Sequence, residues 1–204
     1  MKNKLALALV SVFVTACGGG GGGGGSSTTP AVTPVAAPLA AYVGTWESAC
    51  DVHERETATF TVDASGVLLI ATKTEYFSAV GCTGLILATE TLSANFSAAY
   101  TGTVDASVQL AAGATPTAIK VDTVNSSVPA YSMQISGPGV VRATQNGKPQ
   151  WCINYGGGSQ TCVNDDGAQP AATARGGLYL KGNQLFSLDA NGSAFAVGGI
   201  YTKK

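Results

Sequence analysis

The side chains that could perform acid–base chemistry gather in one short stretch of the chain. His53, the only histidine, stands among Asp51, Glu54 and Glu56. A histidine beside carboxylates could act as a general base toward a serine hydroxyl, and serines are plentiful here. The Gly-x-Ser-x-Gly turn that exposes such a serine in many hydrolases does not occur in the sequence. We therefore interpret His53 as a solvated loop residue and expect no catalytic residue and no enzyme activity.

Two further motifs could hold ions or cofactors. Asn164-Asp165-Asp166-Gly167 offers oxygen ligands for calcium, but it lacks the register of an EF-hand loop and its final glutamate. The glycine run from Gly18 to Gly25 is not followed by Lys-Ser or Lys-Thr, as a phosphate-binding loop would be. We interpret the first motif as a turn and the second as a spacer, and we expect no metal ion and no cofactor.

The chain begins with the pattern of an export signal. Lys2 and Lys4 precede an apolar run from Leu5 to Val14, and the segment ends with Val14-Thr15-Ala16-Cys17. A basic start, a short apolar core and a small-residue exit are typical of a signal peptide. The apolar run is shorter than the roughly 20 residues that span a bilayer. We expect residues 1–16 to be a signal peptide.

Val14-Thr15-Ala16-Cys17 resembles the bacterial lipobox, in which small residues precede a cysteine that receives lipid. In that family the signal peptide is cut before the cysteine, so the resemblance implies that Cys17 is the acylated N-terminus, carrying palmitate-type chains. Each buried CH₂ contributes about 0.8 kcal/mol, and two or more chains anchor a protein stably in a membrane. Gly18 is not the aspartate that favours inner-membrane retention, so the resemblance implies an outer-membrane lipoprotein of a Gram-negative cell envelope. An ordinary secretory signal is the alternative.

A tether is expected between the lipid and the folded domain. Gly18 to Gly25 is unbroken glycine, and Ser, Thr, Ala, Val and three prolines follow up to Ala41. Glycine loses much entropy on ordering and has no side chain to bury, so residues 17–41 are expected to form a disordered linker. Similar glycine tracts occur in surface lipoproteins of the factor H-binding and transferrin-binding kinds, which this tract resembles. The sequence places a single domain at residues 42–204.

The remaining four cysteines predict two disulfides. An even number in an exported chain indicates a disulfide framework with three possible pairings. We favour Cys50–Cys82 and Cys152–Cys162. The first bridge closes the longer loop and should stabilise the fold by roughly 3–4 kcal/mol, and the second by slightly under about 3 kcal/mol. A zinc site is the rival interpretation, but no Cys-x-x-Cys pair occurs.

The folded region alternates with a period of two residues, as β-strands do. Between Leu85 and Val104 one parity is mainly apolar and the other mainly polar, and a break is expected near Leu92-Ser93-Ala94-Asn95 because 20 residues exceed an ordinary strand. Turn sequences such as Asp63-Ala64-Ser65-Gly66 and Asn146-Gly147 separate other short alternating stretches. These features predict an all-β, antiparallel barrel of about 8–10 strands, with a β-sandwich as the alternative.

Tyr42-Val43-Gly44-Thr45-Trp46 resembles the Gly-x-Trp start of lipocalin-like barrels, and the resemblance covers about residues 42–104. It implies an up-and-down barrel in which Trp46 packs at the barrel floor. In that family an arginine of the last strand often covers the tryptophan. Here Ala194 to Tyr201 contains no arginine, and only Lys203 and Lys204 follow.

Composition narrows the class of function. Without residues 1–16 the chain keeps nine Lys and Arg against twelve Asp and Glu, which leaves a net charge of −3. A mildly acidic chain without a basic cluster has no electrostatic footprint for nucleic acid. We expect a monomeric, non-catalytic binding domain on a membrane anchor. What the domain binds is left with two alternatives. It could hold a small apolar ligand in the barrel mouth, or it could be an envelope or surface lipoprotein that binds or inhibits another protein.

Overall fold

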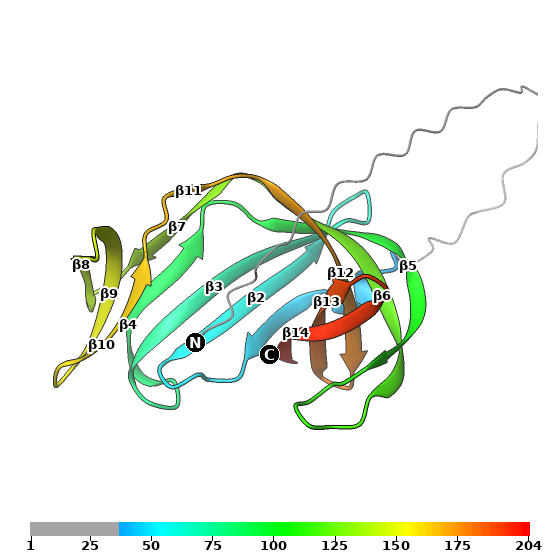
Figure 1. Ribbon diagram of the computed structural model, residues 1–204, viewed down its shortest axis with the longest axis horizontal. Coiled ribbons are helices and arrows are strands. Elements are labelled where there is room, and N and C mark those ends of the chain that lie inside the picture. The colour runs from blue at the N-terminus through cyan, green and yellow to red at the C-terminus, as the bar shows by residue number, and fades with distance from the viewer. Residues whose placement is uncertain (1–36) are drawn as a thin grey trace, which may run out of the picture.

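The computed structural model describes residues 37–204, so the predicted signal peptide, Cys17 and the linker up to residue 36 lie outside the described residues. The described part consists of β-strands and one 3₁₀ turn, η1 (Ala40–Tyr42) (Figure 1). This confirms the predicted all-β fold. The strands are β1 (Gly44–Ser48), β2 (Glu54–Val62), β3 (Leu68–Ala79), β4 (Thr83–Leu92), β5 (Phe96–Val108), β6 (Thr117–Val128), β7 (Tyr131–Ser136), β8 (Val140–Gln145), β9 (Lys148–Gly156), β10 (Ser159–Asn164), β11 (Ala168–Gln169), β12 (Ala172–Lys181), β13 (Gln184–Asn191) and β14 (Ala194–Lys203).

Eight of these strands close into an antiparallel ring in the order β3-β2-β1-β14-β13-β12-β6-β5. The ring closes where Leu68–Ile70 of β3 pairs with Phe96–Ala98 of β5. Closure removes the exposed edges that an open sheet would leave. The predicted antiparallel barrel is therefore present, with a strand order that departs from simple sequence order between β6 and β12 and between β3 and β5, where β4 is left out of the ring.

An extension leaves the barrel from the second half of β3. Lys73–Ala79 pairs with β4 instead of β5, and β4 continues the sheet to β7 and β11. The predicted break is found: β4 ends at Leu92 and β5 begins at Phe96. A separate three-stranded sheet, β8–β9–β10, lies at the end of the molecule opposite β12–β14 (Figure 1).

Side chains fill one end of the barrel. The cluster includes Leu39, Trp46, Phe60, Leu68 and Leu185, each 5% exposed or less. Leu39 belongs to the stretch that the sequence assigns to the linker, yet it is fully buried because η1 turns the chain into the barrel. Burying such a side chain contributes about 1.5–3 kcal/mol, which explains why order begins before the first strand.

Two other clusters stabilise the rest of the sheet. Leu185 belongs to the barrel cluster, whereas its neighbour Phe186 packs with Val121 and Leu188, so these two cores lie on opposite faces of β13. The third cluster joins the small sheet to the extension through Ile153 on β9, which packs against Tyr76 and other residues of the extension. The small sheet is thus anchored by a buried aliphatic residue.

Two disulfides cross-link the structure in the pairing favoured from the sequence. Cys50 is bonded to Cys82, with Cα atoms 5.7 Å apart, and Cys152 is bonded to Cys162. The second bridge joins directly opposed residues of β9 and β10. The first joins the β1–β2 loop to the β3–β4 turn, and so holds two separate connections together.

Candidate functional site

The barrel interior around Tyr42 and Trp46 is closed by the protein's own side chains. The Tyr42 hydroxyl donates a hydrogen bond to Asp122 (2.7 Å), and Trp46 Nε1 donates to the Tyr42 carbonyl (2.8 Å). Two depressions of the described part lie elsewhere, on the outer surface. One is lined by Glu47, Arg55 and other mainly polar residues, and the other by a row of threonines with Lys73.

Trp46 is 1% exposed and lies within the barrel core. Lys203, whose Cα is paired with that of Trp46 across β14 and β1, places its Nζ 5.3 Å from the centre of the indole ring. A cation at this distance from an aromatic face is attracted to it. Lys203 thus forms a cation–π contact with the buried Trp46.

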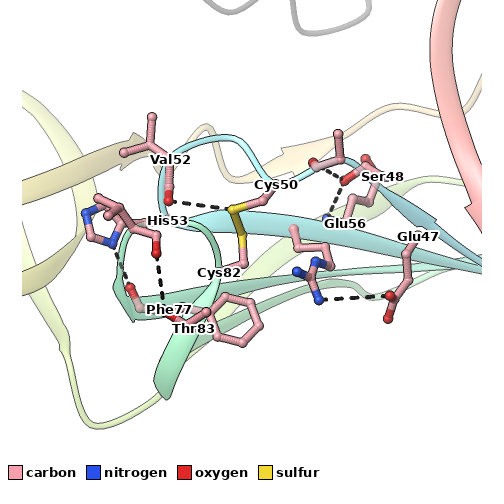
Figure 2. Close-up of a disulfide and its surroundings, with 12 residues drawn as sticks. Glu47, Ser48, Cys50, Val52, His53, Glu56, Phe77, Cys82 and Thr83 are labelled. Carbon is pink, nitrogen blue, oxygen red and sulfur yellow. Dashed lines mark hydrogen bonds and ion pairs between the residues drawn. A yellow bond between two sulfur atoms is a disulfide. The ribbon is translucent and has the colours of Figure 1, made fainter.

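The surface best suited to bind a partner lies at the end of the sheet where β2 begins and β3 ends. We name it the stapled tip and define it as residues 50–53 and 79–86. Figure 2 shows the Cys50–Cys82 bond between its two segments. Backbone hydrogen bonds reinforce the bond: Gly81 N–H donates to the Val52 carbonyl and Phe77 N–H to the His53 carbonyl, both at 2.8 Å. These links make the tip a rigid unit.

Backbone strain is concentrated in the stapled tip. Val52 has a φ of +57° and Cys82 a φ of +56°. The left-handed region is unfavourable for residues with a Cβ, above all for β-branched ones. Of the three non-glycine residues with positive φ in the described part, two lie in this tip. Strain of this kind persists only where surrounding bonds impose it, and it often marks functional sites.

The stapled tip also exposes apolar side chains. Val52 is 61% exposed, Val80 65%, Leu85 75% and Ile86 43%. Single exposed aliphatic residues are common on protein surfaces, but a group of them at one place indicates an interaction site. Because the loops are cross-linked, these side chains are presented in a fixed arrangement.

His53 connects the stapled tip to the small sheet. Its Nδ1 lies 2.9 Å from the carbonyl oxygen of Phe77, which can only accept a hydrogen bond, so Nδ1 carries the proton. Its ring stacks on Tyr155 of β9 with centroids 4.0 Å apart. His53 is therefore not the solvated loop residue expected from the sequence, because Tyr155 partly buries its ring and the ring has a structural role.

Carboxyl–tyrosine pairs behind the stapled tip are a feature that the sequence analysis does not identify. Tyr76 donates to Glu90 (2.7 Å), and Tyr201 donates to Glu56 (3.3 Å). Burial raises the pKa of the Glu56 carboxyl, and the nearby Glu90 adds to the effect. Burial likewise raises the pKa of Tyr76 and Tyr201. Each carboxylate has a tyrosine partner, so the pairs act as buried links between strands.

The predicted turn at Asn164–Gly167 has its own ion pair. Asp165 accepts a bond from Arg142, which holds the pKa of that carboxyl below its ordinary value. Over residues 37–204 no group of histidine, cysteine and carboxylate side chains is arranged to hold a metal ion. In the same region no helix has the length and hydropathy needed to cross a membrane.

The arrangement offers a rigid apolar contact surface, because the stapled tip combines exposed aliphatic side chains with a fixed backbone. The two cysteine pairs were expected from the sequence, but this surface was not. Val52 and Val80 come from different loops, and they lie near each other only because the two loops meet in space. Searches with the sequence and the fold found no match among protein-family models, curated proteins or solved structures.

Proposed function

We propose that the chain is an exported lipoprotein, anchored through Cys17, whose non-catalytic β-domain binds another protein through the stapled tip. The lipobox-like Val14–Cys17 supports the anchor. The Cys50–Cys82 and Cys152–Cys162 bonds support an oxidising compartment outside the cytoplasm, such as the outer-membrane envelope, because structural disulfides persist there.

The packing of one end of the barrel with side chains favours a protein partner over a small apolar ligand. Barrels of about eight strands either pack their interior with side chains or hold one ligand. Here Leu39 and Trp46 occupy the interior at one end with no more than 1% exposure. A ligand there would have to displace the segment from Ala40 to Tyr42, which is tied to Asp122 and to Trp46.

The observation that carries the proposal is the rigid presentation of Val52, Val80 and Leu85. A surface that is already ordered loses less conformational entropy on binding than a flexible loop does. The four exposed aliphatic residues of the stapled tip can therefore contribute most of their burial energy to a complex. Each provides about 25 cal/mol for every Å² of apolar area removed from water.

The point of attachment supports the same assignment. Ala37, the first described residue, lies beside Gly66 in the turn between β2 and β3. The register of these strands puts that turn at one end and the stapled tip at the other. Nine residues of β2 span about 30 Å. The linker therefore leaves from the end opposite the stapled tip, which leaves the tip accessible to a partner.

Photo-crosslinking in living cells of the native host tests the proposal. We expect Val80→p-benzoylphenylalanine to yield a discrete crosslinked protein, and the same substitution at the exposed Ser65, in the opposite turn, to yield none. A fatty-acid probe should label the natural chain but not a Cys17→Ser variant. Labelling of the Ser variant contradicts the anchor, and equal crosslinks from both positions contradict the assignment of the tip. A small molecule that co-purifies with the chain and is seen by native mass spectrometry contradicts the choice of a protein partner.

A further inference from the structure

A polar groove continues the stapled tip along the outer surface of the barrel. It is lined by residues 47–50, at and just after the end of β1, by Arg55 of β2, by Gln184 of β13, and by Ile200, Thr202 and Lys203 of β14. Figure 2 shows the chain running from Glu47 through Ser48 to the Cys50–Cys82 bond. Cys50 belongs to the groove and to the stapled tip, so the two surfaces are continuous. A protein that covers the stapled tip can therefore extend into the groove.

Arg55 is held at the groove without using its hydrogen-bond donors. Its guanidinium carbon lies 5.7 Å from the centre of the Phe77 ring, and one of its nitrogens lies 3.9 Å from Oε2 of Glu47. The second distance is within the range of an ion pair but too long for a hydrogen bond. Within residues 37–204 the guanidinium donates no hydrogen bond, although the side chain is only 31% exposed. Its five N–H groups are therefore left for water or for a ligand.

The groove has more free donors than free acceptors. Of the described residues that line it, Glu47 alone has a carboxylate, and its Oε1 already accepts a hydrogen bond from Nζ of Lys204 at 2.6 Å. Lys203 adds a second cation to the lining. The side chains of Gln184 and Thr202, which can each donate, make no hydrogen bond to the described part of the chain. Because the whole chain has a net charge of −1, this excess of donors and positive charge is local to the groove.

We propose that the groove binds a carboxylate of the partner protein, with Arg55 as the main anchor. This inference rests on the proposed function, since it gives the chemistry of the same partner. An ionised carboxylate only accepts hydrogen bonds and can receive two from one guanidinium, so it complements a groove whose free groups are donors. The contact of Arg55 with Phe77 reduces the freedom that the side chain loses on binding. The partner segment therefore carries an acidic residue, or its C-terminal carboxylate, next to the apolar residues that cover the stapled tip.

The membrane that holds the anchor is a poorer source of the anion. Lipid phosphate groups would also accept bonds from Arg55. However, the first described residue, Ala37, lies beside Gly66 in the turn that follows β2, whereas Arg55 is the second residue of β2. The groove and the point of attachment are therefore at opposite ends of this strand. A chain tethered in this way holds the groove away from its own membrane, where a protein can reach it.

Crosslinking from the groove maps the partner segment. Ile200 is 39% exposed and lines the groove. In the full chain, expressed in the native host, Ile200→p-benzoylphenylalanine should capture the same protein as Val80→p-benzoylphenylalanine. Mass spectrometry of the captured peptide should find an aspartate, a glutamate or the C-terminus of the partner, which also tells these sources apart. A crosslink from position 80 without one from position 200, a captured segment without a carboxylate, or a lipid captured at position 200 overturns the inference and leaves the proposed function standing. The absence of both crosslinks overturns the proposed function itself.

Substitutions measure the contribution of Arg55. The Val80→p-benzoylphenylalanine chain is irradiated in detergent extract, at a dilution that halves its crosslink yield. Arg55→Gln should weaken binding about tenfold or more, as the loss of a charged hydrogen bond implies, so the yield falls from one half to about one tenth of its maximum. Arg55→Lys should retain part of the binding, because it keeps the charge but loses the paired donors. Arg175→Gln, the same change at an exposed position on β12, should have no effect. An unchanged thermal midpoint shows that each variant is folded, and equal yields from Arg55→Gln and Arg175→Gln overturn the inference.

Discussion

Substitution of Val52 by asparagine should stabilise the protein while weakening its binding. Val52 has a φ of +57°, where a residue with a Cβ pays roughly 1–2 kcal/mol. Asparagine tolerates this region far better, because its short polar side chain can bond locally. The substitution should therefore remove much of the backbone strain.

The loss of packing at this position is small. Val52 is 61% exposed, so about two-fifths of its side chain is removed from water. Full burial of a valine contributes about 1.5 kcal/mol, so the buried part contributes roughly 0.6 kcal/mol. The net effect of Val52→Asn is a stabilisation of about 0.5–1 kcal/mol. In a domain of this size that is a rise of about 1–4 °C in the melting temperature.

Val80→Asn is a matched control for the Val52 prediction. Val80 belongs to the same stapled tip and is 65% exposed, but its φ is not positive. Calorimetry with both disulfides intact should show a rise in the melting temperature for Val52→Asn and no rise for Val80→Asn. Both variants should lose binding to a captured partner. If Val52→Asn melts at or below the temperature of the Val80 variant, the strain argument is wrong.

Three further predictions concern the interior. Replacing the Cys50–Cys82 pair by serines should lower the unfolding free energy by roughly 3–4 kcal/mol, and replacing the Cys152–Cys162 pair should lower it by slightly under about 3 kcal/mol, because the first bridge closes the longer loop. Urea unfolding of the two variants measures both losses, and a larger loss for the Cys152–Cys162 variant contradicts the prediction. Leu39→Ala should lower the unfolding free energy by about 2–4 kcal/mol although it precedes every strand, because its side chain is fully buried; a cost below about 0.5 kcal/mol would place Leu39 outside the core. Glu56 has a raised pKa in the folded state, so its protonated form stabilises the fold fully below about pH 4.5, the ordinary pKa of the group. This stabilisation is lost as the pH rises through the folded pKa. Glu56→Gln should therefore raise the melting temperature at pH 7.5 more than at pH 4, and an equal shift at both values refutes the assignment.

Local features of the sequence determined the strand content and its turns. Alternation between Leu85 and Val104 and the turn residues near Ser93 are read from neighbouring positions, because the two faces of a strand differ in burial. The Cys50–Cys82 pairing could also be favoured from spacing and from the export signal. Trp46 was expected at the barrel floor from a family resemblance, and its side chain is 1% exposed.

Tertiary structure alone decided what the barrel holds and which surface is open. The burial of Leu39 depends on η1 turning into the barrel, and the pair of Glu56 with Tyr201 joins residues 145 positions apart. The extension exists because β3 changes partners from β5 to β4 along its length. Periodicity states which way a side chain points, but strand order and register come from contacts between distant segments, which no local pattern encodes.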